Sequence, residues 1–389
     1  MGRFRVLLLA VLILCSCKHT TQDQNYTIPF VDLICNTTEE DEISNYIEDV
    51  QVIELSLDSL MYVYPGKILI NGNYIFALSG GQVYQFDKTG KFLGQIGRIG
   101  NGPGEYLSIS DICISSDLRK IYCQDSQNNV LVFDAHSRQF ERTINSGIVG
   151  NSSNAIIPYG KNGFALLVNN SVDPSNFEED FFCLQCYDRS GKLVDEFLRR
   201  DDFNMPMSYF SNSIQGSDNT YYLSYIPSEG TFYKDDNGSI SPYLNLSFGK
   251  KSLPFRFAIH GKNDPWDKVE EIFASDYYKC ISTLCSTNDV IYCYAFGPNH
   301  SRYHFVIDSA SKHGIRWKAS NFCSVMAAVA ADDDYIYYVY TAAHEDAKRS
   351  PYYTPDILRT ALEEKLTLTY NEADNPVIIK VKYSLRTIQ

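Results

Sequence analysis

Residues 82–93 read QVYQFDKTGKFL, an alternating strand followed by an Asp-x-x-Gly turn at Asp87 and the beginning of a second strand. The same phrase recurs along the chain, at 130–134, 182–193, 231–238 and 303–308, with a degenerate copy at 377–383. Its Asp returns about every 50 residues, a period typical of repeat architectures. Short runs rich in Tyr, Ile, Val and Phe, separated by Asn, Asp, Gly and Ser turns, favour an all-β fold.

A pair of expected strands precedes each copy of the phrase. These pairs occupy residues 67–78, 111–123, 155–168, 212–225, 281–294 and 325–340. Two strands before the Asp, one that ends in it and one after it make a four-stranded antiparallel blade, and six such blades predict a six-bladed β-propeller. The alternative, a two-domain β-sandwich, predicts no such recurrence.

The ends of the chain predict how the ring closes. The last blade is one outer strand short, because the sequence ends soon after residues 377–383. Residues 50–57, VQVIELSL, alternate like a strand and precede the first blade. We therefore expect this N-terminal strand to pair with the C-terminal blade and to leave no open edge.

The amino terminus is expected to be a targeting signal. Arg3 and Arg5 precede the apolar run 6–14, which is too short to span a bilayer. Leu14-Cys15-Ser16-Cys17 resembles the lipobox of bacterial lipoproteins, in which the Cys after the cleavage site carries acyl chains such as palmitate. We expect a signal peptide at 1–16, lipidation at Cys17, a flexible tether at 17–45 and the propeller at 46–389. The alternative is an ordinary cleaved signal peptide with an incidental Cys.

Composition narrows the class of partner. The chain of 389 residues has 47 acidic and 34 basic side chains, a net charge of −13, and 14% aromatic residues. This balance argues against nucleic-acid binding, which needs clustered Lys and Arg. The first acidic residue after the lipobox is Asp23. Surface-exported lipoproteins of Bacteroidetes tend to carry acidic residues nearer the Cys, so we expect an outer-membrane anchor facing the periplasm.

Residues 90–106, GKFLGQIGRIGNGPGEY, together with Asn375-Pro376-Val377-Ile378, carry a family resemblance. The chain resembles the six-bladed β-propeller lipoproteins of Bacteroidetes, distant relatives of NHL-repeat propellers, over residues 46–389. The resemblance implies a fold and an envelope location. It implies no catalytic residue, because the family has no agreed catalytic motif.

The Gly-rich connection that leads into the second blade is one candidate site. Its three glycines and its proline suit a tight path with positive φ angles. In the alternative reading, Arg98, Glu105 and Tyr106 face the central channel and hold a polar ligand, with Asp125 nearby. The stretch is no phosphate loop, since it lacks Gly-Lys-Ser/Thr and no helix follows it.

Two insertions are the other candidate site, and both are expected on one face of the ring. Residues 248–279 contain Trp266 and a helical stretch at 265–277, and residues 341–375 contain His344, Tyr352 and a helix from Pro355 to about Leu366. Long aromatic-rich loops at a channel mouth suit ligand recognition. They equally suit a cap over the channel, and both readings stay open.

Other motifs give weaker predictions. Cys183 and Cys186 have Cys-x-x-Cys spacing but fall in a strand, where they would point to opposite faces, so we predict no metal site there. Asp58-Ser59-Leu60 resembles a Bacteroidetes O-glycosylation site at Ser59.

The function expected from these features is recognition without catalysis. We expect a tethered propeller that binds a glycan, a peptide or a protein partner through its insertion-bearing face. The rival is a lyase or lactonase that uses a channel-bound divalent metal such as Ca²⁺, with Glu105 and Asp125 as candidate ligands. A third possibility is a structural subunit of a larger outer-membrane complex.

Overall fold

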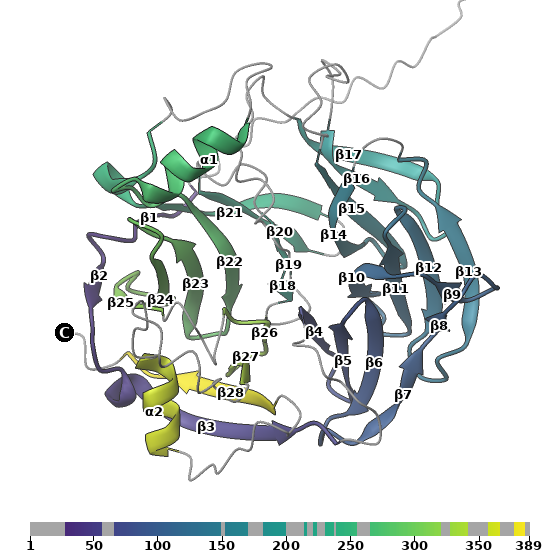
Figure 1. The fold of residues 1–389 in the computed structure, drawn as a ribbon, viewed down its shortest axis with the longest axis horizontal. Helices are drawn as coiled ribbons and strands as arrows, with labels where there is room; N and C mark the ends of the chain where they lie inside the picture. The colour runs from purple at the N-terminus through teal and green to yellow at the C-terminus, as the bar shows by residue number, and fades with distance from the viewer. Residues whose placement is uncertain are drawn as a thin grey trace, which may run out of the picture.

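The structure, a computed structural model, is a closed ring of six β-sheets, which we number as blades 1–6 in chain order (Figure 1). It describes residues 28–56, 66–148, 152–169, 182–199, 214–215, 221–223, 230–236, 239–254, 265–319, 327–340, 357–365 and 377–385. Each blade has four antiparallel strands that run in order from the centre to the rim, so the predicted fold class is confirmed.

The strands of blades 1–3 follow one another without interruption. They are β4 (Lys67–Ile70), β5 (Tyr74–Ser79), β6 (Gln82–Asp87) and β7 (Phe92–Ile96); β10 (Ile109–Ile114), β11 (Lys120–Asp125), β12 (Asn129–Asp134) and β13 (Phe140–Asn145); β14 (Ser152–Tyr159), β15 (Gly163–Asn169), β16 (Phe182–Tyr187) and β17 (Leu193–Arg199). Cys183 and Cys186 both lie on β16, a strand as predicted.

Blades 4–6 include the insertions and the ring closure. Their strands are β18 (Ile214–Gln215), β19 (Tyr221–Leu223), β20 (Thr231–Asp236) and β21 (Ser239–Ser247); β22 (Cys280–Ser286), β23 (Val290–Phe296), β24 (Arg302–Asp308) and β25 (Gly314–Lys318); β26 (Ala330–Ala331), β27 (Ile336–Tyr340), β28 (Val377–Tyr383) and β3 (Ile47–Glu54).

The recurring Asp closes the turn between the third and fourth strands. Asp87 Oδ1 accepts hydrogen bonds from the backbone N–H groups of Thr89 and Lys91, at 2.8 and 3.1 Å. Asp188 repeats this pattern with Ser190 and Lys192, at 2.8 and 3.0 Å. A short side chain that accepts from the backbone two and four residues ahead is the reason this residue recurs.

An N-terminal strand closes the ring, as predicted. β3 is the outer strand of blade 6 and pairs antiparallel with β28, from Val377 opposite Glu54 to Lys382 opposite Asp49. The strand begins three residues earlier than expected. The first and last segments of the chain therefore share one sheet, and blade 6 cannot form without both.

The predicted tether at 17–45 is too long at its C-terminal end. Two further strands, β1 (Phe30–Asp32) and β2 (Thr37–Glu39), add in parallel to the outer edges of blades 4 and 5. Val31 and Leu33 are fully buried, and hydrophobic burial holds this segment against the ring. We call residues 28–46 the strap, because they run along the rim past two blades before β3 joins the third (Figure 1).

Two short helices complete the fold. α1 (Pro265–Ala274) lies in the connection between blades 4 and 5, and α2 (Ile357–Lys365) lies between the second and third strands of blade 6, so both predicted helical insertions are confirmed. Leu358 and Leu362 of α2 pack with Ile43 and Ile47. This side of α2 thus covers the end of the strap at the rim. No helix among the described residues is long and apolar enough to cross a membrane.

Strand direction assigns each connection to a face. Strands alternate in direction within a blade, so the connections between blades share a face with the turns between second and third strands. We call this the insertion face; it includes residues 97–108, α1 and α2. The opposite face holds the remaining turns, including those with the recurring Asp, and we call it the turn face.

Candidate functional site

The Gly-rich connection between blades 1 and 2 folds as a small ribbon. β8 (Arg98–Ile99) pairs in parallel with β9 (Glu105–Tyr106), and Figure 1 places both at the periphery of the ring. Gly97 has φ of +64°, and a Cβ there would lie 2.7 Å from the Tyr106 ring and 2.9 Å from the carbonyl oxygen of Gly104. Glycine is therefore required by both the backbone conformation and the close approach.

Arg98 and Glu105 pair with each other inside this ribbon. Arg98 Nε donates to Glu105 Oε1 at 2.6 Å, and a second guanidinium nitrogen lies 2.6 Å from the same oxygen. The backbone N–H of Gly102 donates to Glu105 Oε2 at 2.7 Å. This hydrogen bond, followed by those from Arg98, holds the pKa of the Glu105 carboxyl below its usual value. The carboxylate is therefore occupied by its own loop.

Tyr106 points into the protein and not into the central channel. Its side chain is buried with the blade 1 and blade 2 core, and its hydroxyl donates to the carbonyl oxygen of Ile96 at 2.8 Å. Burial raises the pKa of Tyr106 to about 12. The expectation that Arg98, Glu105 and Tyr106 face the channel is wrong, because the ribbon folds outward and its polar groups bond to one another.

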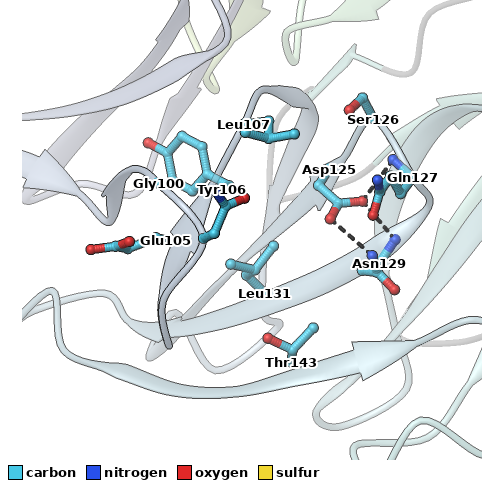
Figure 2. A pocket seen from close by; sticks show the side chains of 11 residues that line it. Gly100, Glu105, Tyr106, Leu107, Asp125, Ser126, Gln127, Asn129, Leu131 and Thr143 are labelled. Carbon is cyan, nitrogen blue, oxygen red and sulfur yellow. Dashed lines mark hydrogen bonds between the residues drawn. The ribbon is translucent and has the colours of Figure 1, made fainter.

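Asp125 caps the turn between β11 and β12. Its Oδ1 accepts from the backbone N–H groups of Gln127 and Asn129, both at 2.8 Å. Its Oδ2 accepts from the Asn129 side-chain amide at 3.0 Å. Figure 2 shows these bonds drawing the carboxylate toward its own hairpin.

The structure brings Glu105, Tyr106 and Asp125 around one pocket of about 240 Å³ on the insertion face (Figure 2). The ribbon forms one wall and the β11–β12 turn the other. Leu107, whose side chain is 61% exposed, lines the opening. Sequence reasoning missed several lining residues, and only their closeness to the Gly-rich motif could have suggested them: Asn101, Leu107, Gln127 and Thr143.

The inner wall of the ring has a buried ion pair that sequence reasoning also missed. Lys67 on β4 and Asp111 on β10 lie 2.7 Å apart and are both almost buried. Asp111 Oδ2 also accepts from the backbone N–H of Ile156 on β14, at 2.8 Å. One carboxylate thus joins the inner strands of three successive blades, which is a structural role.

The remaining predicted site residues are only partly described. Trp266 lies on α1, but its side chain is outside the described residues. Cys17, Ser59, His344 and Tyr352 also lie outside them. Within the described part of the chain, no group of three or more His, Cys, Asp or Glu side chains is placed to hold a metal ion. The Ca²⁺ of the enzyme hypothesis stays a prediction.

These features define a six-bladed β-propeller with a small pocket at the rim of its insertion face. The chain belongs to a family described as a domain of unknown function, DUF4934, and the match spans residues 25–382. The strap lies within this range. No curated protein is significantly similar in sequence.

Solved structures support the fold. A crystal structure of a Bacteroides fragilis protein described as exported is 19% identical, with a TM-score of 0.67, covering 90% of this chain and 98% of that one. The virginiamycin B lyase of Staphylococcus aureus is 11% identical, with a TM-score of 0.44 and coverage of 86% and 99%. BamB of Moraxella catarrhalis is 11% identical, with a TM-score of 0.38 and coverage of 76% and 75%. At these identities the likeness concerns the fold alone.

Proposed function

We propose that this protein is a lipid-anchored recognition propeller of the cell envelope, which binds a neutral glycan or peptide segment without chemical conversion. The observation that carries the proposal is the state of the carboxylates around the 240 Å³ pocket. Glu105 is held by Arg98 and the Gly102 N–H, and Asp125 by its own hairpin. Carboxylates engaged in this way suit a rigid wall better than proton transfer.

The groups left to meet a ligand favour a neutral one. Asn101, Gln127 and Thr143 supply amide and hydroxyl groups, and Leu107 supplies an apolar contact. Amides and hydroxyls both donate and accept hydrogen bonds, which matches sugar hydroxyls or a peptide backbone. Because the volume is about 240 Å³, the pocket suits one sugar ring or one to two peptide units of a longer chain.

The proposed location follows from the amino terminus. Cys17 stands where a lipobox places the acylated residue, and the Bacteroides fragilis relative is described as exported. The strap starts at residue 28 on the rim, so about ten residues separate the proposed anchor from the folded ring. We propose outer-membrane attachment with the propeller facing the periplasm.

Arrays of glycans and peptides, probed with the chain from residue 18 onward, test the binding function. Leu107 lines the pocket, whereas Ile99 is similarly exposed on the same ribbon and does not, so Leu107→Asp and Ile99→Asp form a matched pair. We expect Leu107→Asp to weaken the binding of array ligands roughly tenfold, and Ile99→Asp to leave it within about twofold. Equal effects of both variants, or none, would contradict the proposed site.

A further inference from the structure

The turn face contains a second and larger pocket, where blade 6 meets blade 1. Its volume is about 490 Å³, within the range of roughly 300–1,000 Å³ usual for small-molecule sites. Blade 1 contributes Asn71 and Lys88 from two turns, and blade 6 contributes Asp332 and Lys380. We call it the seam pocket, because it lies between the blade that opens the ring and the blade that closes it.

Apolar side chains form much of its lining. Ile53 comes from β3, Ile70 and Ile75 from β4 and β5, and Tyr337 from β27. Leu118, from the turn between β10 and β11, extends the lining to blade 2. The pocket thus offers a ligand an apolar surface contributed by three blades.

The charges of blade 6 in the pocket are already matched within the protein. Asp332 Oδ2 accepts from the Tyr337 hydroxyl at 2.5 Å and lies 3.7 Å from Lys380 Nζ. Asp332 Oδ1 accepts from the backbone N–H of Tyr335 at 2.7 Å. Lys380 Nζ also sits over the Tyr335 ring, 4.2 Å from its centroid, in a cation–π contact. Neither charge needs a ligand.

Lys88 differs from Lys380. It lines the same pocket from the exposed turn after Asp87, and it forms no ion pair with any described residue. A cation at the edge of an apolar pocket favours a ligand with one negative charge and an apolar body.

Leu118 has an unusual backbone conformation for its residue type. Its φ is +60°, in the left-handed region, which costs a residue with a Cβ roughly 1–2 kcal/mol. Asn or Gly would adopt this conformation more easily. Retention of a strained, partly buried Leu at the pocket fits a role in contacting a ligand.

We propose that the seam pocket binds a small organic anion: a compound with an apolar body that contacts Leu118 and the isoleucines, and a single carboxylate or sulfonate that pairs with Lys88. This site lies on the opposite face from the pocket of Figure 2 and is independent of the function proposed above. Its ligand would contact blades 1 and 6 together and so stabilise the closure of the ring.

Two fluorescent probes of similar shape test the proposal on the chain from residue 18 onward. 8-Anilinonaphthalene-1-sulfonate carries the negative charge, and N-phenyl-1-naphthylamine lacks it. We expect saturable binding of the sulfonate at one site. Lys88→Gln should weaken sulfonate binding about tenfold, as expected for loss of a charge-assisted contact, and leave the neutral probe unchanged. Lys91→Gln is the matched control, because Lys91 is exposed in the same turn but does not line the pocket.

Leu118→Asn separates ligand contact from a structural role. Asn tolerates the left-handed conformation, so the melting temperature should stay unchanged or rise, while binding of both probes weakens severalfold. Sulfonate binding that is absent, or unaffected by Lys88→Gln and Leu118→Asn, would overturn the proposal. An equal loss of both probes in Lys88→Gln would overturn the anion class.

Discussion

Lys67 Nζ lies 2.7 Å from Asp111 Oδ1, and the pair joins the inner strands of blades 1 and 2 where both side chains are shielded from solvent. Taking one charge from such a pair leaves the other buried and uncompensated. The pair also fixes the position of Asp111 Oδ2, which accepts from the backbone of blade 3. Three neighbouring blades are thus held at the inner wall by one carboxylate.

Asp111→Asn should therefore destabilise the ring strongly. We expect a loss of roughly 3 kcal/mol in the free energy of unfolding, measured by urea denaturation. Lys120→Met is the comparison, because the pair of Lys120 with Asp134 is more exposed, and its loss should cost less than about 1 kcal/mol. Similar losses in the two variants would show that the inner pair is no stronger than an ordinary surface pair.

The strap should contribute to stability although it precedes the first blade. Deletion to residue 39 removes β1 and β2 and exposes the surface that Val31 and Leu33 cover, which should cost on the order of 3–5 kcal/mol. Deletion to residue 27 leaves the strap intact and should change nothing. Equal denaturation midpoints for the two truncated chains would mean that the strap is not held to the ring.

His304 should make the fold sensitive to mild acid. The backbone N–H of Ala328 donates to the Tyr292 hydroxyl at 3.2 Å, and that hydroxyl lies 2.8 Å from His304 Nδ1, so Tyr292 donates to a neutral imidazole. His304 is buried and stacked on Trp317, with ring centroids 4.9 Å apart. Burial lowers the pKa of His304 from 6.5 to about 3.

The sign follows from this depressed pKa. Below pH 6.5 the unfolded chain protonates His304 and the folded chain does not, so stability falls as pH decreases toward 3, by at most about 1.4 kcal/mol per unit. Asp134, whose pKa is lowered to about 2 by hydrogen bonds, adds a loss only below about pH 4. Urea midpoints between pH 7 and 4.5 therefore isolate the histidine. His304→Phe should flatten that slope, and an unchanged slope would refute the assignment.

Cys17→Ala should release the protein from the membrane. In cells fed a clickable palmitate analogue, the native chain should be labelled and should sediment with outer membranes, whereas the variant should be unlabelled and soluble. Labelling of the variant would place the acyl chains elsewhere. A native chain that is soluble and unlabelled would support an ordinary cleaved signal peptide.

The sequence predicted the repeats and the closure because these depend on local alternation and on a turn residue, such as Asp87 or Asp188, that acts within four residues. It missed β1 and β2, since strands of three residues carry no periodic signal and their partners lie more than 200 residues away. Tyr106 was predicted in the channel because a motif does not show which way its loop folds. The seam pocket joins residues from both ends of the chain, so no local pattern could reveal it.

The most direct test of recognition without catalysis is the chemical fate of a bound ligand. The tightest glycan or peptide from the arrays is incubated at saturation with the chain from residue 18 onward, with Ca²⁺ or with EDTA, and analysed by mass spectrometry. We predict that the ligand is recovered unchanged, with the same affinity under both conditions. Conversion of the ligand, or binding that EDTA abolishes, would contradict this account and favour a metal-dependent enzyme.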